Sequence, residues 1–280
     1  PLRELQLTMP DPLIIMFEGY HGCNPYNDFS GWIADLQAQG YSIMVNTAPI
    51  SLSVLQQADI LVVPGADANY RITSPYTSSE ASIIAQFVNL GGGLFLTTDW
   101  DVFSDDTEAI ASAFGITIDG SSGGWVVFTT FDTTHPIMQG ISSVKFFMYT
   151  TITPGPSSAL IWQTDLEPVA VTLKHGSGKV AVFGDYNFVD TPYVNGYNTL
   201  DNAKLAMQTI KWLAPTPKKI SVTVDKPYPQ YYRYGQTMKV NITFENPHLE
   251  PNAVIFVWYA WVLYPKQMWI LIMATPYTMP

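Results

Sequence analysis

Short apolar runs alternate with helix-like segments through the first 214 residues, and this alternation constrains the fold more than any other feature. The apolar runs have the length of buried strands and stand at 13–17, 41–45, 59–63 and 94–98. Parallel strands need a crossover between them, and a helix usually supplies it. We therefore predict an α/β fold with a doubly wound, mainly parallel sheet in residues 1–214.

Local signals place the helices and the later strands of this region. Thr77 and Glu80 have the spacing of a capping box, and the helix that they open should end near Gly91. After residue 114 the pattern is more strand-like, and a hairpin is predicted to turn at 175–178. Further helices are predicted at 28–39, 51–57, 105–114 and 201–213.

A proline-rich linker at 215–219 divides the chain, and the helical periodicity disappears beyond it. Residues 220–280 are predicted to form a small all-β, immunoglobulin-like sandwich. About 60 residues fall short of the roughly 100 that such a sandwich uses, and its last strands are apolar on both faces. A continuation of the chain or a neighbouring subunit should cover them, and the expected assembly surface contains Trp258, Trp261 and Trp269.

Composition excludes some classes of function. Lys and Arg number 13 against 23 Asp and Glu, and the net charge of −10 argues against nucleic-acid binding, which needs a basic surface. Charged residues make up only 13%, against roughly 25% usually, which favours an extracellular or cell-surface protein. The single cysteine, Cys23, excludes an intrachain disulfide and a cysteine-based zinc site. The longest apolar run, 253–264, is too short to span a bilayer.

The order of several blocks resembles glutamine amidotransferase-like domains of class I. The blocks are "ADILVVPGADANY", "SSEASIIAQFVNLGGGLFLTTDW", "HPIMQGI", "GKVAVFGDYNFVD" and "DNAKLAMQTIKWLA". The resemblance covers about residues 11–214 and is nearest to the non-catalytic branch found in archaeal and bacterial surface proteins and secreted subtilases. The N-terminal domains of gliding-type transport proteins and of an intraflagellar transport protein are relatives of this branch. The block "YGQTMKVNITFEN" resembles the sandwich repeats of archaeal surface proteins.

The resemblance also implies that the enzymatic activity is lost. In catalytic amidotransferases, the strand after the glycine run leads to a cysteine nucleophile, and a late strand supplies histidine and glutamate. Here Thr98 and Asp99 follow the first strand, and Gly184, Asp185 and Tyr186 follow the late one. Thiolate chemistry needs a cysteine beside a base, so we expect no enzyme of this type.

Acidic side chains follow several of the predicted strands. Parallel strands end at one edge of their sheet, where ligands commonly bind, and repulsion among carboxylates there can be relieved by a cation such as Ca²⁺. The alternative is that Asp99 and Asp185 accept backbone N–H bonds and organise loops, which we favour, so that no cofactor is expected beyond a candidate calcium ion. The residues of this candidate cleft are Glu18, His21, Asp67, Asp99, Asp101, Asp185 and Asp190.

Other candidate residues have ordinary structural interpretations. Cys23 lies two residues after His21, but the strand-to-helix elbow of a nucleophile is missing, so a structural loop cysteine is favoured. His135 is expected to anchor a loop, and His175 and His248 are not expected to be ligands. Asn241 begins the sequon Asn-Ile-Thr and is a candidate glycosylation site.

These observations favour a non-enzymatic extracellular protein that self-associates, such as a subunit of a surface layer or filament, with glycans as further partners. One alternative is a carbohydrate-binding or accessory region of a secreted hydrolase or protease, with Trp100, Trp125 and Tyr186 as sugar contacts. The other is a hydrolase that uses the acidic strand-end cleft.

Overall fold

The computed structural model describes residues 5–6, 13–21, 24–65, 75–99, 105–121, 124–163, 167–192, 196–215, 219–224, 240–245, 259–263 and 266–270. The chain is divided into two compact units. Residues 9–217 form the larger unit, and residues 1–8 with 218–280 form the smaller one. Among the described residues, no helix is both long enough and apolar enough to cross a bilayer.

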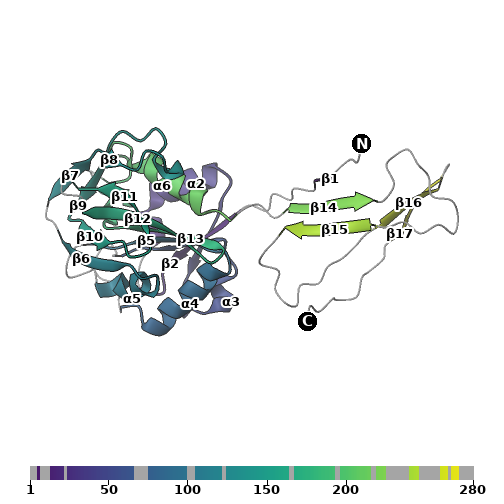
Figure 1. Ribbon diagram of the computed structural model, residues 1–280, viewed down its shortest axis with the longest axis horizontal. Coiled ribbons are helices and arrows are strands. Elements are labelled where there is room, and N and C mark those ends of the chain that lie inside the picture. Colours follow the sequence, from purple (N-terminus) through teal and green to yellow (C-terminus); the bar gives the residue numbers. More distant parts are fainter. Residues whose placement is uncertain are drawn as a thin grey trace. The chain divides into compact units, whose positions relative to one another are not determined.

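A mixed sheet of eight strands is the centre of the larger unit (Figure 1). In spatial order the strands are β3 (Ser42–Asn46), β2 (Ile14–Glu18), β4 (Ile60–Val63), β5 (Gly93–Thr97), β13 (Gly178–Phe183), β12 (Pro168–His175), β11 (Ser158–Trp162) and β8 (Thr130–Phe131). The pairings from β3 to β13 are parallel, whereas those from β13 to β8 are antiparallel. The prediction of an α/β fold is confirmed, with a sheet that is parallel in one half only.

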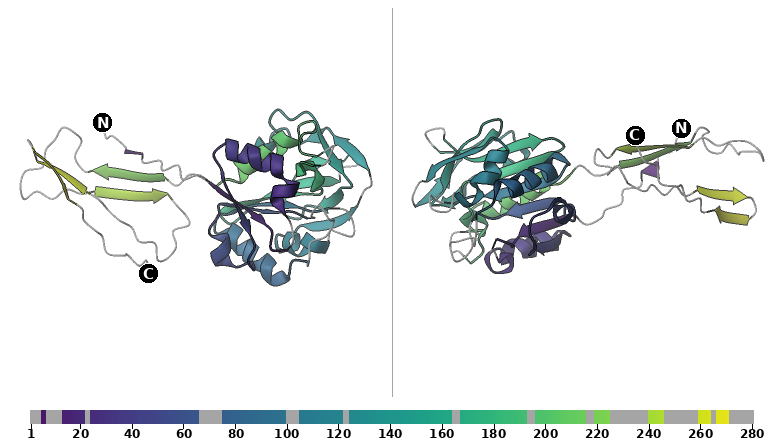
Figure 2. Two further views of the ribbon diagram at one scale, coloured as in Figure 1. Left: turned by 180° about the vertical axis from the view of Figure 1, so that it is seen from behind. Right: turned by 90° about the horizontal axis from the view of Figure 1, so that it is seen from below.

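Helices cover both faces of this sheet. They are α1 (Pro25–Asp28), α2 (Ser30–Ala38), α3 (Leu52–Leu55), α4 (Ser78–Asn89), α5 (Asp105–Ala113) and α6 (Asn202–Leu213), with 3-10 turns η1 (Pro136–Met138) and η2 (Asn187–Val189). One face packs against α2 and α6, and the other against α3, α4 and α5. Figure 2 shows the same two helical layers from behind and from below. Phe95 faces the first layer while Leu94 and Leu96 face the second, which explains why β5 is apolar throughout.

The local predictions for the larger unit agree with the structure except in detail. Thr77 and Glu80 form the predicted capping box of α4, and the hairpin between β12 and β13 pairs His175 with Gly178. The helix predicted at 28–39 begins earlier, at Pro25, and is divided at Phe29, whose backbone angles (φ −117°, ψ 26°) are not helical. This division separates α1 from α2.

Two small antiparallel sheets complete the larger unit. β6 (Thr117–Ser121) pairs with β10 (Thr150–Thr153), and β7 (Trp125–Phe128) pairs with β9 (Val144–Phe147). The strand-like character after residue 114 is therefore confirmed, although the sequence did not indicate β6. Figure 1 shows the two sheets at the side of the unit away from the linker.

The smaller unit contains strands in two separate sheets. β1 (Leu5–Gln6), β14 (Lys219–Val224) and β15 (Val240–Glu245) form one, and β16 (Tyr259–Leu263) and β17 (Lys266–Ile270) form an antiparallel pair. An immunoglobulin-like sandwich stays a prediction. Asn241 lies in β15 and pairs with Thr223 of β14, and the backbones of Trp261 and Trp269 lie in β16 and β17. Trp258 lies outside the described residues.

Candidate functional site

The candidate site lies at the edge where the parallel strands β2, β4, β5 and β13 end. At this edge the turns after β5 and β13 are adjacent, because the N–H of Thr98 donates to the carbonyl of Phe183 at 2.9 Å. The N–H of Gly65, after β4, donates to the hydroxyl of Thr97 at 2.9 Å. A Cβ on Gly65 would lie 2.6 Å from the carbonyl oxygen of Thr97, so this close approach requires glycine. One backbone hydrogen bond and one bond to the Thr97 hydroxyl thus hold these strand ends together.

Glu18, the last residue of β2, is fully buried and accepts three hydrogen bonds. Its Oε2 accepts from the Tyr76 hydroxyl at 2.6 Å and from the His21 N–H at 3.4 Å, and its Oε1 accepts from the Tyr20 N–H at 2.7 Å. Burial raises the pKa of Glu18 above its ordinary value, and the hydrogen bond from Tyr76 opposes this shift. The carboxylate therefore fixes the loop after β2 to the segment before α4.

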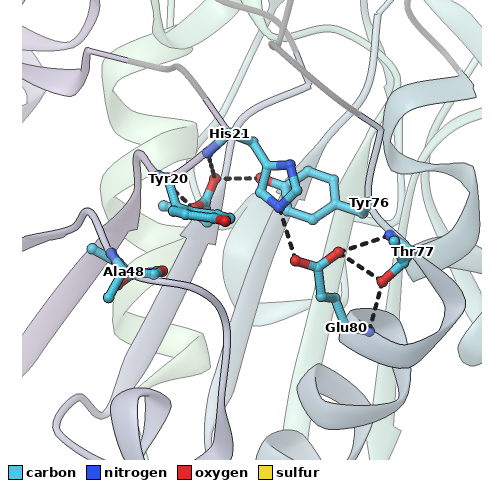
Figure 3. Close-up of polar contacts among 8 residues, drawn as sticks. Tyr20, His21, Ala48, Tyr76, Thr77 and Glu80 are labelled. Atoms are coloured by element: carbon cyan, nitrogen blue, oxygen red, sulfur yellow. Dashed lines mark hydrogen bonds and ion pairs between the residues drawn. The ribbon is translucent and has the colours of Figure 1, made fainter.

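His21 connects this cluster to the N-terminus of α4 (Figure 3). Its Nε2 lies 3.1 Å from Oε1 of Glu80, while Oε2 of Glu80 accepts from the N–H and the hydroxyl of Thr77 at 2.9 and 2.8 Å. The ring of His21 also packs on Tyr76, with the ring centres 4.1 Å apart. Burial raises the pKa of Glu80, but the hydrogen bonds from Thr77 and His21 outweigh it and hold the pKa below its ordinary value.

The arrangement of these groups determines which chemistry is available. A carboxylate bonded to one imidazole nitrogen orients the ring, as in a general base. However, only 3% of His21 is exposed, so a substrate reaching its ring would first have to displace Tyr76 or Tyr20, which contact it. The geometry is that of a closed polar cluster that joins β2, its loop and α4.

Asp185, after β13, also organises backbone. Its Oδ2 accepts the N–H of Phe147 at 3.0 Å, and its Oδ1 accepts the N–H of Asn187 at 2.8 Å. Complete burial raises the pKa of Asp185 to about 7, against the lowering effect of these N–H donors. The carboxylate joins the small sheet of β9 to the turn at η2, as the loop-organising interpretation expects.

The other cleft residues are only partly described. Asp99 and Asp190 are buried, at 4% and 6% exposure, and each has an interaction partner. Asp67 and Asp101 lie outside the described residues, as do Cys23, Trp100 and His248. In the described part of the chain, no three His, Cys, Asp or Glu side chains come close enough together to hold a metal ion. The candidate calcium site stays a prediction.

Two expectations on single residues have clear outcomes. His135 anchors a loop as expected, because its Nδ1 accepts the N–H of Ile137 at 3.3 Å. The prediction that Tyr186 contacts a sugar is wrong, because this residue is 2% exposed and belongs to the core. Tyr76 and the bond from His21 to Glu80 were missed, although the capping box had already marked Glu80. No sequence signal connects His21 with a residue 59 positions away.

Comparisons with known proteins support the fold. No family model and no curated protein matches the sequence. Among solved structures, the N-terminal domain of mmIFT52 matches with a TM-score of 0.57 and 15% identity over 71% of this chain and 96% of that one. A cytoplasmic protein from Salmonella typhimurium matches with a TM-score of 0.51 and 13% identity over 73% of this chain and 100% of that one. The β-galactosidase from Rahnella sp. R3 matches with a TM-score of 0.50 and 12% identity, over 84% of this chain but 41% of that one.

Proposed function

We propose that the chain is a non-enzymatic extracellular structural protein, a subunit of a surface layer or filament, whose α/β unit is a degenerate amidotransferase-like scaffold. The observation that carries the proposal is the pair of adjacent turns after β5 and β13. They hold Thr98 and Asp99 in one turn and Asp185 in the other, where the resemblance would require a thiol and an imidazole. Asp185 is fully buried and bonded to two backbone N–H groups, which suits a structural role.

The use of the other polar groups at this edge supports the same proposal. The carboxylate of Glu18 accepts hydrogen bonds from three donors, and the ring of His21 contacts both Glu80 and Tyr76. A catalytic acid or base needs hydrogen-bond reach to a substrate, whereas these groups reach one another. Assembly is assigned to the smaller unit, where Trp258, Trp261 and Trp269 form the proposed contact surface and Asn241 the proposed glycan site.

Sedimentation velocity and negative-stain imaging of the full chain test the assembly proposal. We expect a concentration-dependent series of oligomers that is lost when Trp261 and Trp269 are both replaced by Ser. The exposed Tyr26→Ser in the α/β unit serves as the matched control, and it should leave the oligomers intact. A chain that stays monomeric at all concentrations would refute the proposal.

A panel of glutamine, peptide and glycan substrates tests the absence of enzymatic activity. We expect no turnover above the uncatalysed rate. Turnover that is abolished by Asp99→Asn but kept in the exposed Asp119→Asn would establish a hydrolase that uses the strand-end edge, and would overturn the proposal.

One observation favours a second candidate, a carbohydrate-binding accessory region. Trp125 is 37% exposed and stacks on Phe147 with the ring centres 4.1 Å apart. Lys145 lies over the Trp125 ring, with its Nζ 4.9 Å from the centre. Tryptophan combines an apolar ring with an N–H donor, which suits contact with a sugar at an exposed position. A glycan array would support this candidate if binding disappeared in Trp125→Ala and persisted in Tyr26→Ala, and an array without any hit would end it.

A further inference from the structure

A surface pocket of about 360 Å³ lies beside the last two turns of α6, away from the acidic strand ends. Its lining residues are Pro136, Lys179, Gln208, Lys211 and Trp212. Its volume is near the lower end of the range for small-ligand pockets, roughly 300–1,000 Å³. Lys179 stands at the start of β13, so the pocket is at the opposite end of that strand from Asp185.

The larger unit is strongly acidic, yet two of its few lysines, Lys179 and Lys211, line this pocket. Residues 9–217 contain 6 Lys and Arg against 19 Asp and Glu, a difference of −13. Four of the six cations are close to α6 or to the start of β13. They are Lys174, Lys179, Lys204 and Lys211. We expect this concentration of lysines to make the potential at the pocket more positive than that of the rest of the unit.

Fold stability does not explain all of these lysines. Lys174 and Lys179 are direct partners across β12 and β13, and like charges in that position destabilise a sheet. Burial lowers the pKa of Lys179, and the charge of Lys174 lowers it further. A negative charge bound in the pocket would relieve this repulsion.

The C-terminus of α6 accounts for one lysine at most. Nζ of Lys179 donates to the carbonyls of Trp212 and Ala214 at 2.6 and 3.0 Å, and so caps the helix. A helix C-terminus carries a negative charge of about half a unit, which is less than the charge of Lys179 alone. Lys211 adds a further full charge, so the pocket stays positive after the helix is neutralised.

Lys211 is the donor that remains available for a ligand. Gln208 already donates its amide to the carbonyl of Ile137, whereas Lys211 is exposed and makes no hydrogen bond or ion pair with the described residues. Lys204, Gln208 and Lys211 follow one another at helical spacing, so they share one face of α6. Trp212 and Pro136 supply apolar surface in the lining that they share with Lys211.

We propose that this pocket binds a carboxylate, with Lys211 pairing the anion and Trp212 and Pro136 contacting the carbon chain that bears it. One free ammonium matches a single negative charge. A phosphate dianion would require a converging set of donors, because several N–H groups usually hold it. The carboxylate belongs either to a small organic acid or to an acidic peptide segment, and this ligand is independent of the proposed assembly surface.

Calorimetric titration of the full chain at low salt tests the site with three probes: butyrate, an acetylated Ala-Glu-Ala amide and inorganic phosphate. We expect the carboxylates to bind more tightly than phosphate. Lys211→Gln should weaken binding about fivefold and Lys211→Glu about tenfold or more, since one exposed ion pair contributes up to about 1 kcal/mol. The control is Lys145→Glu, which removes the lysine over the Trp125 ring, outside the lining of this pocket, and should change the affinity less than about twofold.

The outcomes distinguish the two sources of the carboxylate from each other and from the results that would refute the proposal. Binding of butyrate and peptide alike indicates a free acid site, and binding of the peptide alone indicates an acidic segment. Tighter binding of phosphate would overturn the carboxylate assignment. Absence of binding to the wild-type chain, or equal affinities of Lys211→Glu and the wild type, would overturn the site itself.

Discussion

Replacement of Tyr76 by Phe removes one hydrogen bond from the centre of the polar cluster. The hydroxyl of Tyr76 lies 2.6 Å from Oε2 of fully buried Glu18, and the only other described donor to that oxygen is the His21 N–H at 3.4 Å. A hydrogen bond to a charged group contributes about 1.5–3 kcal/mol. We therefore expect Tyr76→Phe to lower the free energy of unfolding by about 2 kcal/mol wherever Glu18 is ionised.

The pH dependence of this loss identifies its cause. The Tyr76 hydroxyl favours the charged form of Glu18, so its removal raises the pKa of Glu18 further. The loss should be complete above the folded-state pKa, where the carboxylate is charged, and should shrink as the pH falls through that pKa and the group is protonated.

Urea unfolding over a pH series is the assay. With an m value of about 3 kcal/mol/M, a loss of 2 kcal/mol lowers the midpoint by about 0.7 M. Tyr149→Phe is the matched control, because its hydroxyl is buried without a hydrogen-bond partner among the described residues and its removal should cost almost nothing. Equal midpoints for the two variants at every pH of the series would refute the reasoning.

Three further substitutions have expected outcomes. Thr77→Ala removes the capping box of α4 and should lower the free energy of unfolding by about 1 kcal/mol, measured by urea unfolding beside the exposed Ser82→Ala. Asp185→Asn should flatten the stability profile between pH 3.8 and about 7: in that range the folded chain keeps a proton that the unfolded chain has lost, so wild-type stability falls as pH rises. An unchanged slope of stability against pH in Asp185→Asn would contradict the raised pKa of Asp185. Gly65→Ala places a Cβ 2.6 Å from the Thr97 carbonyl and should cost about 1–3 kcal/mol, seen as a lower Tm.

The sequence predicts most elements of the larger unit because their signals are local. β2, β4 and β5 are continuous apolar runs, and the capping box and the β12–β13 hairpin depend on residues within a few positions of one another. β6 was missed because Thr-Ile-Asp-Gly-Ser has no apolar alternation, and its pairing with β10 alone makes it a strand. The division at Phe29 likewise depends on packing, since Phe29 is fully buried beside Phe17.

The candidate site is less predictable because it depends on the order of strands in space. Glu18 and His21 were identified from their position after a strand, but their partners come from α4 and the segment before it. Tyr186 follows a strand in the same way, and the sequence suggested exposure, whereas the residue packs into the core. A residue that follows a strand can be assigned to the edge of the sheet from the sequence. Whether its side chain is exposed or packs into the core depends on neighbours that the sequence does not identify.

The pairing of β1 with β14 makes the larger unit an insertion within the sheet of the smaller one. Leu5 pairs with Val222, and joining such distant residues in an unfolded chain costs about 5 kcal/mol of loop entropy. The folded α/β unit removes most of this cost, because Ile15 pairs with Ile60, and Ile60 and the end of α6 both lie against Gly93. The first strand and the last helix of the larger unit are therefore close together before β1 pairs with β14. We therefore expect the larger unit to fold first and the pairing of β1 with β14 in the smaller unit to follow.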